Sequence, residues 1–203
     1  MTVTITPAAT GSGAPALGEP LAVEYGNTWH AVRGTRGGLH DALATPETLA
    51  AWLVEHGGRF PEGVADAALA GLRAEDLPRW TALRDAIRTV EQAVVTGTAP
   101  DADALATVNT AAAAAPRVPR LVLDADGRLT AVEVADPHPH AALAALAASA
   151  IDVFGGPQAA ALRACEGPGC VLFYVRNHPR RGWCSPGCGN RARVARYHER
   201  HKG

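Results

Sequence analysis

The chain has 203 residues, enough for one compact domain with a small appendage or for two modest domains. Of these residues, 47% are hydrophobic and 19% are charged, which is typical of a globular protein. No apolar run is long enough to cross a bilayer, so we expect no membrane partner. The net charge of −1 conceals a division, because residues 165–203 carry eight Lys and Arg against two acids (+6), whereas residues 1–164 carry eleven against eighteen (−7). A basic tail on an acidic body favours a polyanionic partner over a merely solvated arginine-rich helix.

Residues 1–18 are rich in Thr, Pro, Gly and Ala, which predicts a flexible leader rather than a helix or strand. They lack the basic and apolar regions of a secretory signal, so we expect a cytoplasmic location, with association to the nucleoid if the protein binds DNA. Thiols stay reduced in the cytosol, which favours metal binding over disulfides for clustered cysteines.

Residues 19–160, called the body below, read as mostly helical. Residues 20–34 are ambiguous between a short strand and a helical turn, but 45–57 predict a helix with Thr45 as N-cap and Pro46 at its first position. Further helices are predicted within 61–72, 74–97, 101–115 and 136–156, a β-hairpin around "DADG" within 116–134, and a helical turn at 157–165. The expected fold class is therefore α+β, a mostly helical N-terminal domain with a small antiparallel hairpin or sheet.

The four cysteines follow the spacing C-x4-C-x13-C-x3-C, and they are Cys165, Cys170, Cys184 and Cys188. Two close pairs separated by a spacer of this length predict one tetrahedral zinc site. Because four thiolates close the coordination shell, the Zn²⁺ would be structural rather than catalytic. The alternatives are four buried free thiols or two disulfides.

The residues around the cysteines support this interpretation. Residues 167–169 are suited to a tight turn, and Ser185 can cap a helix that has Pro186 at its first position. Cys188 then falls in the first turn, where the helix dipole favours a thiolate. The alternation in residues 171–183 predicts a hairpin between the two cysteine pairs.

The sequence "CGNR" at 188–191, preceded by "WCS" at 183–185, resembles the CGNR zinc finger family. The sequences "LGEPLAVEYGNT" at 17–28 and "LATPETLAAWL" at 43–53 resemble the opening of the ABATE domain, which precedes the finger in that family. The resemblance implies a stress-related transcription regulator with a small treble-clef-type finger, built as knuckle, hairpin and helix, that binds DNA. We expect this finger to span residues 163–203.

After Cys188, helical spacing places Arg193, Arg196 and Arg200 on one stripe, and Val194 and Tyr197 on a stripe that would pack against the hairpin. The predicted nucleic-acid contacts are Arg176, Arg180, Arg181, Arg191, Arg193, Arg196, Arg200 and Lys202. Near the metal, Ser185 and Asn190 would hold the helix to the knuckle, and Arg191 would either brace the fold or contact a base.

The body has no phosphate-binding glycine loop, nucleophile elbow or catalytic triad, so we do not expect an enzyme. Asn27, Thr28, Trp29 and Arg84 are candidates for a small-molecule effector pocket; alternatively, Trp29 is a core residue and Asn27 and Thr28 cap a helix. One small finger offers few base contacts, so a homodimer is expected. The function favoured is a DNA-binding transcription regulator, and the alternative is a zinc-stabilised adaptor for protein or structured RNA.

Overall fold

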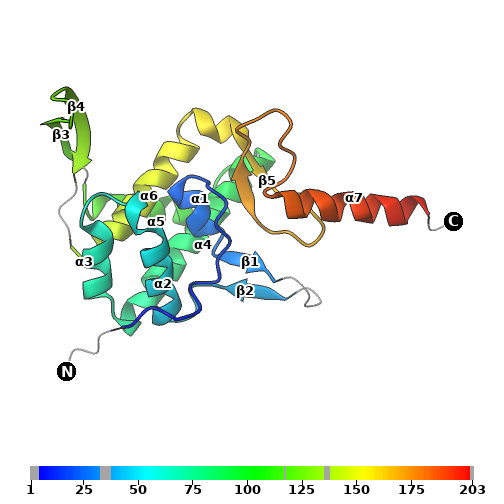
Figure 1. The fold of residues 1–203 in the computed structure, drawn as a ribbon, viewed down its shortest axis with the longest axis horizontal. Coiled ribbons are helices and arrows are strands. Elements are labelled where there is room, and N and C mark those ends of the chain that lie inside the picture. Colours follow the sequence, from blue (N-terminus) through cyan, green and yellow to red (C-terminus); the bar gives the residue numbers. More distant parts are fainter. Residues whose placement is uncertain (1–4, 33–37, 117, 135–137, 202–203) are drawn as a thin grey trace.

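The computed structural model describes residues 5–32, 38–116, 118–134 and 138–201. The helices are α1 (Leu21–Gly26), α2 (Pro46–His56), α3 (Val64–Gly71), α4 (Leu77–Thr96), α5 (Ala102–Ala113), α6 (Ala141–Phe154) and α7 (Pro186–Arg200). Three 3₁₀ turns are η1 (Gly57–Arg59), η2 (Ala74–Asp76) and η3 (Pro157–Ala161). Antiparallel pairs join β1 (Trp29–Ala31) to β2 (Leu39–Asp41), β3 (Val118–Leu123) to β4 (Leu129–Val134), and β5 (Leu162–Ala164) to β6 (Phe173–Val175). The predicted α+β class is confirmed (Figure 1).

The predicted helix starts are confirmed where a side chain caps them. The Thr45 hydroxyl accepts a hydrogen bond from the Thr48 amide, 3.3 Å away, and Pro46 is the first residue of α2. The Asp101 carboxylate accepts from the Ala104 amide at 2.8 Å and starts α5. Each cap satisfies an amide that the helix itself leaves unpaired.

The core of the body surrounds α6, which contacts α1, α3, α4 and α5. Its buried positions are mostly alanines, and Ala142, Ala147 and Ala150 have no exposed surface. Small side chains let the neighbouring helices approach α6 closely, so a helix with few large residues can occupy the centre. Beside it, the Tyr25 hydroxyl donates to the Trp80 carbonyl at 2.6 Å, and the Tyr25 ring packs against Trp52 with centroids 5.2 Å apart.

A second cluster of buried side chains joins the finger to the body. Val23 of α1 and Val153 of α6 pack against Leu162, Phe173 and Val175 of the β5–β6 hairpin. The β5–β6 hairpin thus packs against α1 and α6, and the finger and the body share buried apolar surface. The expected boundary near residues 160–163 stays a prediction.

The prediction of a hairpin within residues 171–183, between the two cysteine pairs, is wrong in its position. Strand β6 pairs with β5, which precedes Cys165, so the hairpin flanks the first cysteine pair. Residues 157–165, expected as a helical turn, divide into η3 and then β5. Burial of Leu162 against the body favours the strand, a contact that no local pattern reveals.

The long axis of the molecule ends in two different projections. The β3–β4 hairpin stands out at one end, and α7 extends at the other, beyond the β5–β6 hairpin (Figure 1). Among the described residues, no helix combines the length and the apolar character that a membrane span requires.

Candidate metal centre and nucleic-acid interface

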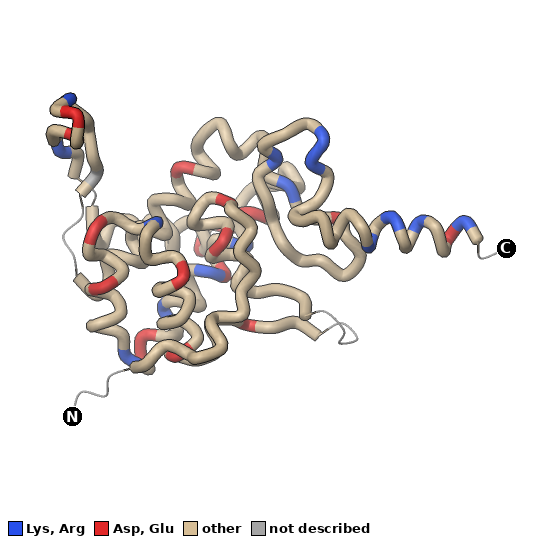
Figure 2. Tube along the Cα trace, viewed as in Figure 1, with Lys and Arg blue, Asp and Glu red and all other residues tan. Residues whose placement is uncertain are grey.

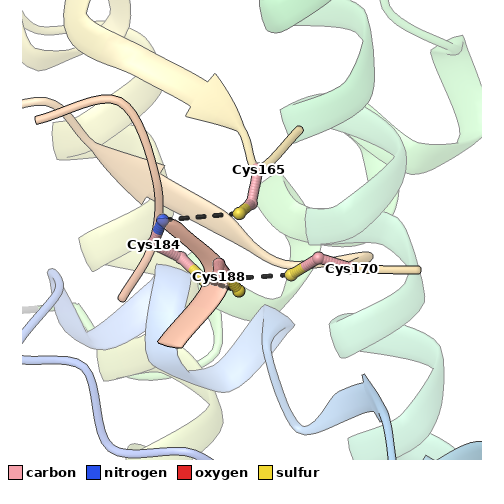
Figure 3. A group of neighbouring side chains, drawn as sticks. All are labelled: Cys165, Cys170, Cys184 and Cys188. Atoms are coloured by element: carbon pink, nitrogen blue, oxygen red, sulfur yellow. Dashed lines mark hydrogen bonds between the residues drawn. The ribbon is translucent and has the colours of Figure 1, made fainter. Parts of the chain in front are cut away.

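The four cysteine side chains converge on one point, although they come from three segments (Figure 3). Cys165 follows β5, Cys170 precedes β6, Cys184 lies before α7 and Cys188 is in its first turn. Their Sγ atoms all lie within 4.8 Å of one another, with 3.8 Å between Cys170 and Cys184 and 3.3 Å between Cys184 and Cys188. Zn–S bonds of about 2.3 Å in a tetrahedron separate the sulfurs by about 3.8 Å. The cluster therefore has the size and the donor set of a single tetrathiolate zinc site.

The knuckle between Cys165 and Cys170 depends on glycine. Gly169 has a φ of 69°, in the region that glycine adopts without strain. A Cβ atom at Gly167 would lie 2.9 Å from the Cβ of Cys188, so the knuckle can approach α7 only without a side chain there. The Cys170 amide donates to the Gly167 carbonyl at 2.8 Å and closes the turn.

The start of α7 places Cys188 as predicted. Ser185 is the N-cap, and its hydroxyl accepts from the Cys188 amide at 3.3 Å. Gly189 then allows close packing, because a Cβ there would lie 3.0 Å from the Trp183 ring. The backbone also reaches the sulfurs, since the Cys184 amide donates to the Cys165 Sγ at 3.4 Å.

Crowding of the thiols shifts the pKa values of Cys165, Cys170 and Cys184. Hydrogen bonds from the Cys170 and Cys184 thiols lower the pKa of Cys165, and donating to Cys165 raises the pKa of both Cys170 and Cys184. Four thiolates this close repel one another, so they can all ionise only around a cation. A bound Zn²⁺ supplies that charge and holds the three segments together.

Arg191 and Asn190, the last two residues of "CGNR", have different surroundings. One Nη of Arg191 donates to the Cys188 Sγ at 3.0 Å, which places a positive charge beside the thiolate cluster. Asn190 is exposed. The contact of Arg191 favours the bracing role over the base contact.

Arg181 contacts Glu19 of the body and other residues of the finger rather than facing solvent. Its guanidinium donates to the Glu19 carboxylate, to the Val175 carbonyl at 3.1 Å and to the Cys184 carbonyl at 3.0 Å, and it lies over the Tyr174 ring. Only 20% of its side chain is exposed. The expectation that Arg181 contacts nucleic acid does not fit this placement, because these donors already bind the protein.

Glu19 is the body's half of this contact. Only 2% of its side chain is exposed, and its second oxygen accepts from the Val175 amide at 2.8 Å. Burial raises the pKa of Glu19, and the Val175 amide and Arg181 oppose that shift. Glu19 and Arg181 thus form a largely buried ion pair that links the N-terminal end of the body to the loop between β6 and α7.

Asn27 and Arg88 make a second link that sequence reasoning missed. The Asn27 side chain donates to the Phe173 carbonyl and accepts from the Phe173 amide, both at 2.9 Å, so it pairs with β6 as a strand would. Arg88 donates to the carbonyls of Gly26 and Val171 at 2.9 and 3.0 Å. One signal was available, because Arg84, Arg88 and Glu91 recur at helical spacing beside the apolar stripe of α4.

The four candidate effector residues do not gather around one cavity. Trp29 and Arg84 line a hollow of about 280 Å³, and the Arg84 guanidinium lies 5.4 Å from the Trp29 ring centroid while it pairs with Asp41 and Asp85. Asn27 and Thr28 are fully buried, and the Thr28 hydroxyl donates to the Tyr25 carbonyl at 2.7 Å. Asn27 is also the C-cap of α1, which agrees with the alternative of a capping role. An effector stays a prediction.

The remaining arginines among the predicted nucleic-acid contacts are exposed. Arg176 and Arg180 lie on the loop after β6, and Arg193, Arg196 and Arg200 lie along α7 (Figure 2). Lys202 lies outside the described residues. The packing expected for the second stripe of α7 is wrong, since Val194 is 47% and Tyr197 is 54% exposed. Strand β6 pairs with β5 against the body, and among the described residues no other strand packs beneath the outer part of α7.

Two family models match the chain in the predicted order. Residues 19–157 match the ABATE model, described as "Putative stress-induced transcription regulator". The chain belongs to the ABATE family. Residues 161–201 match the CGNR zinc finger, so the ABATE domain precedes a finger whose four cysteines are positioned to bind one structural Zn²⁺. No curated protein matches this ABATE chain in sequence.

Proposed function

We propose that the protein regulates transcription by binding duplex DNA through its finger, with α7 and the loop after β6 as the contact surface, and that it does so as a homodimer. The observation that supports the proposal most is that five arginines on these two elements are exposed: Arg176, Arg180, Arg193, Arg196 and Arg200. Figure 2 shows the basic positions that follow one another along α7. Arginine binds phosphate through two parallel hydrogen bonds. Glu199 is the one acidic residue of α7, so little negative charge opposes a polyanion there.

The zinc site would orient this surface. Cys184 and Cys188 attach the start of α7 to the knuckle, and Ser185 caps the helix. The helix then extends from the finger as a rod of 15 residues, and at 1.5 Å per residue it is about 22 Å long. A helix of this length and charge can lie along a groove of DNA. Binding of phosphates would position it, and base contacts would add specificity.

The exposed Val194 and Tyr197 support a second candidate, an adaptor in which α7 binds an apolar groove of a protein partner. The two functions differ in their response to salt. Phosphate binding releases counterions, so DNA affinity falls steeply as salt rises, whereas an apolar interface responds little.

The test compares Arg193→Ala/Arg196→Ala with Arg193→Lys/Arg196→Lys, which keeps both charges, in titrations of labelled duplex DNA at several salt concentrations. Loss of two phosphate contacts should reduce the slope of log affinity against log salt by about 2, and the lysine variant should keep the slope. All variants should hold one zinc ion per chain. An alanine variant with the wild-type slope and affinity would remove α7 from the interface.

A further inference from the structure

The outer side of α7 carries a stripe of side chains whose role the proposed function leaves open. At about 100° per residue, Asn190, Val194 and Tyr197 fall within about 60° of one another around the helix axis. All three are exposed, Val194 by 47% and Tyr197 by 54% of its surface. These three residues are called the outward stripe below.

The cysteine cluster determines which side of α7 faces outward. The Cys188 side chain belongs to the cluster, and Cys188 lies on the side of the helix opposite the outward stripe. Ala192 and Ala195 share the side of Cys188 and are half-buried, whereas the stripe is exposed. Rotation of α7 about its axis would pull Cys188 out of the cluster, so the cluster holds the stripe in one orientation.

Positive charge borders the outward stripe on one side. Arg193 and Arg200 lie within about 60° of Tyr197 around the helix, and Arg196 lies next to them. The acid Glu199 lies on the other side of the helix from Tyr197, so it does not oppose a polyanion at the stripe. Arginines along one side of a narrow strip of amide and apolar groups suit a helix that binds one phosphate backbone and faces the base edges beside it.

The apolar part of the stripe is too short for a groove on a protein. A helix that docks in such a groove presents apolar anchors at positions i, i+3 or i+4, and i+7. Here Val194 and Tyr197 are apolar, but the residues one turn before and one turn after them are Asn190 and His201. The His201 ring stacks on Tyr197 with centroids 4.1 Å apart, so the stripe ends in a polar group. Charge and length together favour DNA as the occupant.

We propose that the outward stripe enters the major groove of duplex DNA and reads A·T base pairs, with Asn190 bound to an adenine and Val194 against the methyl group of a nearby thymine. The inference rests on the proposed function, because it needs α7 to be the element that contacts DNA. The major groove is about 12 Å wide and admits a helix. Since α7 extends beyond the β5–β6 hairpin, its outer part is free to enter the groove (Figure 1).

The two residues suit these roles by their chemistry and their spacing. An asparagine amide accepts from the N6 amino group of adenine and donates to N7, and an apolar side chain contacts the C5-methyl group of thymine. Asn190 and Val194 are one helical turn apart, about 6 Å along the axis, which matches about two base-pair steps of 3.4 Å. The preferred site should therefore contain an A·T pair for Asn190 and a thymine one or two pairs away for Val194.

The experiment selects the preferred site from a pool of random duplexes with the zinc-loaded full chain, and then titrates altered copies of that site. Uracil in place of thymine lacks the C5-methyl group, and 7-deazaadenine in place of adenine lacks the N7 acceptor. The protein variants are Asn190→Ala and Val194→Ala. Their controls are Asn109→Ala on α5 and Val54→Ala on α2, which change exposed residues of the same types. Zinc content and thermal melting check that every variant is folded.

For the wild type, 7-deazaadenine should weaken binding by about 10-fold, the loss of one hydrogen bond to a base. Uracil should weaken it by about fourfold, the loss of one buried methyl group. Asn190→Ala should abolish the first effect and Val194→Ala the second, because each variant no longer has the group that reads the altered base. Neither variant removes a phosphate contact, so both should keep the wild-type salt slope, and the two controls should behave as the wild type.

A selected site without A·T pairs, or no sequence preference at all, would overturn the inference. So would base substitutions that leave the wild type unaffected, or that cost the same in the variants as in the wild type. In each of these cases a steep salt slope would still support DNA binding by the finger. A protein that binds no duplex, or binds it with a slope near zero, would overturn the proposed function and this inference together.

Discussion

Arg181 gives a sharp test of how the finger is held on the body. Arg181→Ala removes the charged partner of Glu19, whose side chain is only 2% exposed. The Glu19 carboxylate would then keep its hydrogen bond from the Val175 amide. Breaking a buried ion pair from one side costs about 3–5 kcal/mol, because the other charge is left without compensation. For a chain of this size, that loss lowers the melting temperature by about 6–20 °C.

The assay is thermal unfolding of the zinc-loaded protein at neutral pH, with Arg180→Ala as the matched control. Arg180 is the exposed neighbour of Arg181, so its removal should change stability by less than about 0.5 kcal/mol. The double variant Glu19→Gln/Arg181→Ala should regain part of the loss, because no buried charge remains and Gln can still accept from Val175. A single Arg181→Ala variant that melts with the wild type would refute the reasoning.

Three further predictions concern the core and the metal. Burial raises the pKa of Glu91 well above its ordinary value. Because the Glu91 carboxyl binds its proton more tightly in the folded state, the free energy of unfolding falls by about 1.4 kcal/mol per pH unit as pH rises from the unfolded to the folded pKa of Glu91. Glu91→Gln should flatten this pH dependence, measured by urea unfolding. An unchanged pH dependence would contradict the prediction. Gly26→Ala should cost about 1–3 kcal/mol, because its Cβ would lie 2.7 Å from the Glu91 carboxylate, whereas Gly58→Ala meets no atom within 4 Å and should be neutral. Cys188→Ser should lose zinc and unfold the finger, and a folded variant with one zinc by elemental analysis would disprove the ligand assignment.

The features that the sequence predicts correctly are local ones. Thr45 and Asp101 start helices because a cap needs only the next three residues. The cysteine spacing predicts the metal site for a similar reason, since a pair separated by a tight turn can place two sulfurs on one ion. The hairpin at "DADG" also follows from its turn, which Asp124 and Gly127 close.

What the sequence does not predict depends on contacts between distant segments. Glu19 and Arg181 are 162 residues apart, and Asn27 and Phe173 are 146 apart, so neither pair has a local pattern. Arg181 and Arg180 are neighbouring arginines that look alike in the sequence, yet the fold covers most of the Arg181 side chain and leaves Arg180 exposed. The strand β5 is missed for the same reason, because burial of Leu162 against the body decides its structure.

The most direct test of the proposed function is the affinity of the zinc-loaded wild type for a labelled duplex as a function of salt. Five exposed arginines at the finger predict a fall in log affinity that is linear in log salt, with a slope of about −4.5 for each bound chain. A slope near zero, or an affinity that is the same after a chelator has removed the zinc, would contradict a metal-oriented basic helix on DNA.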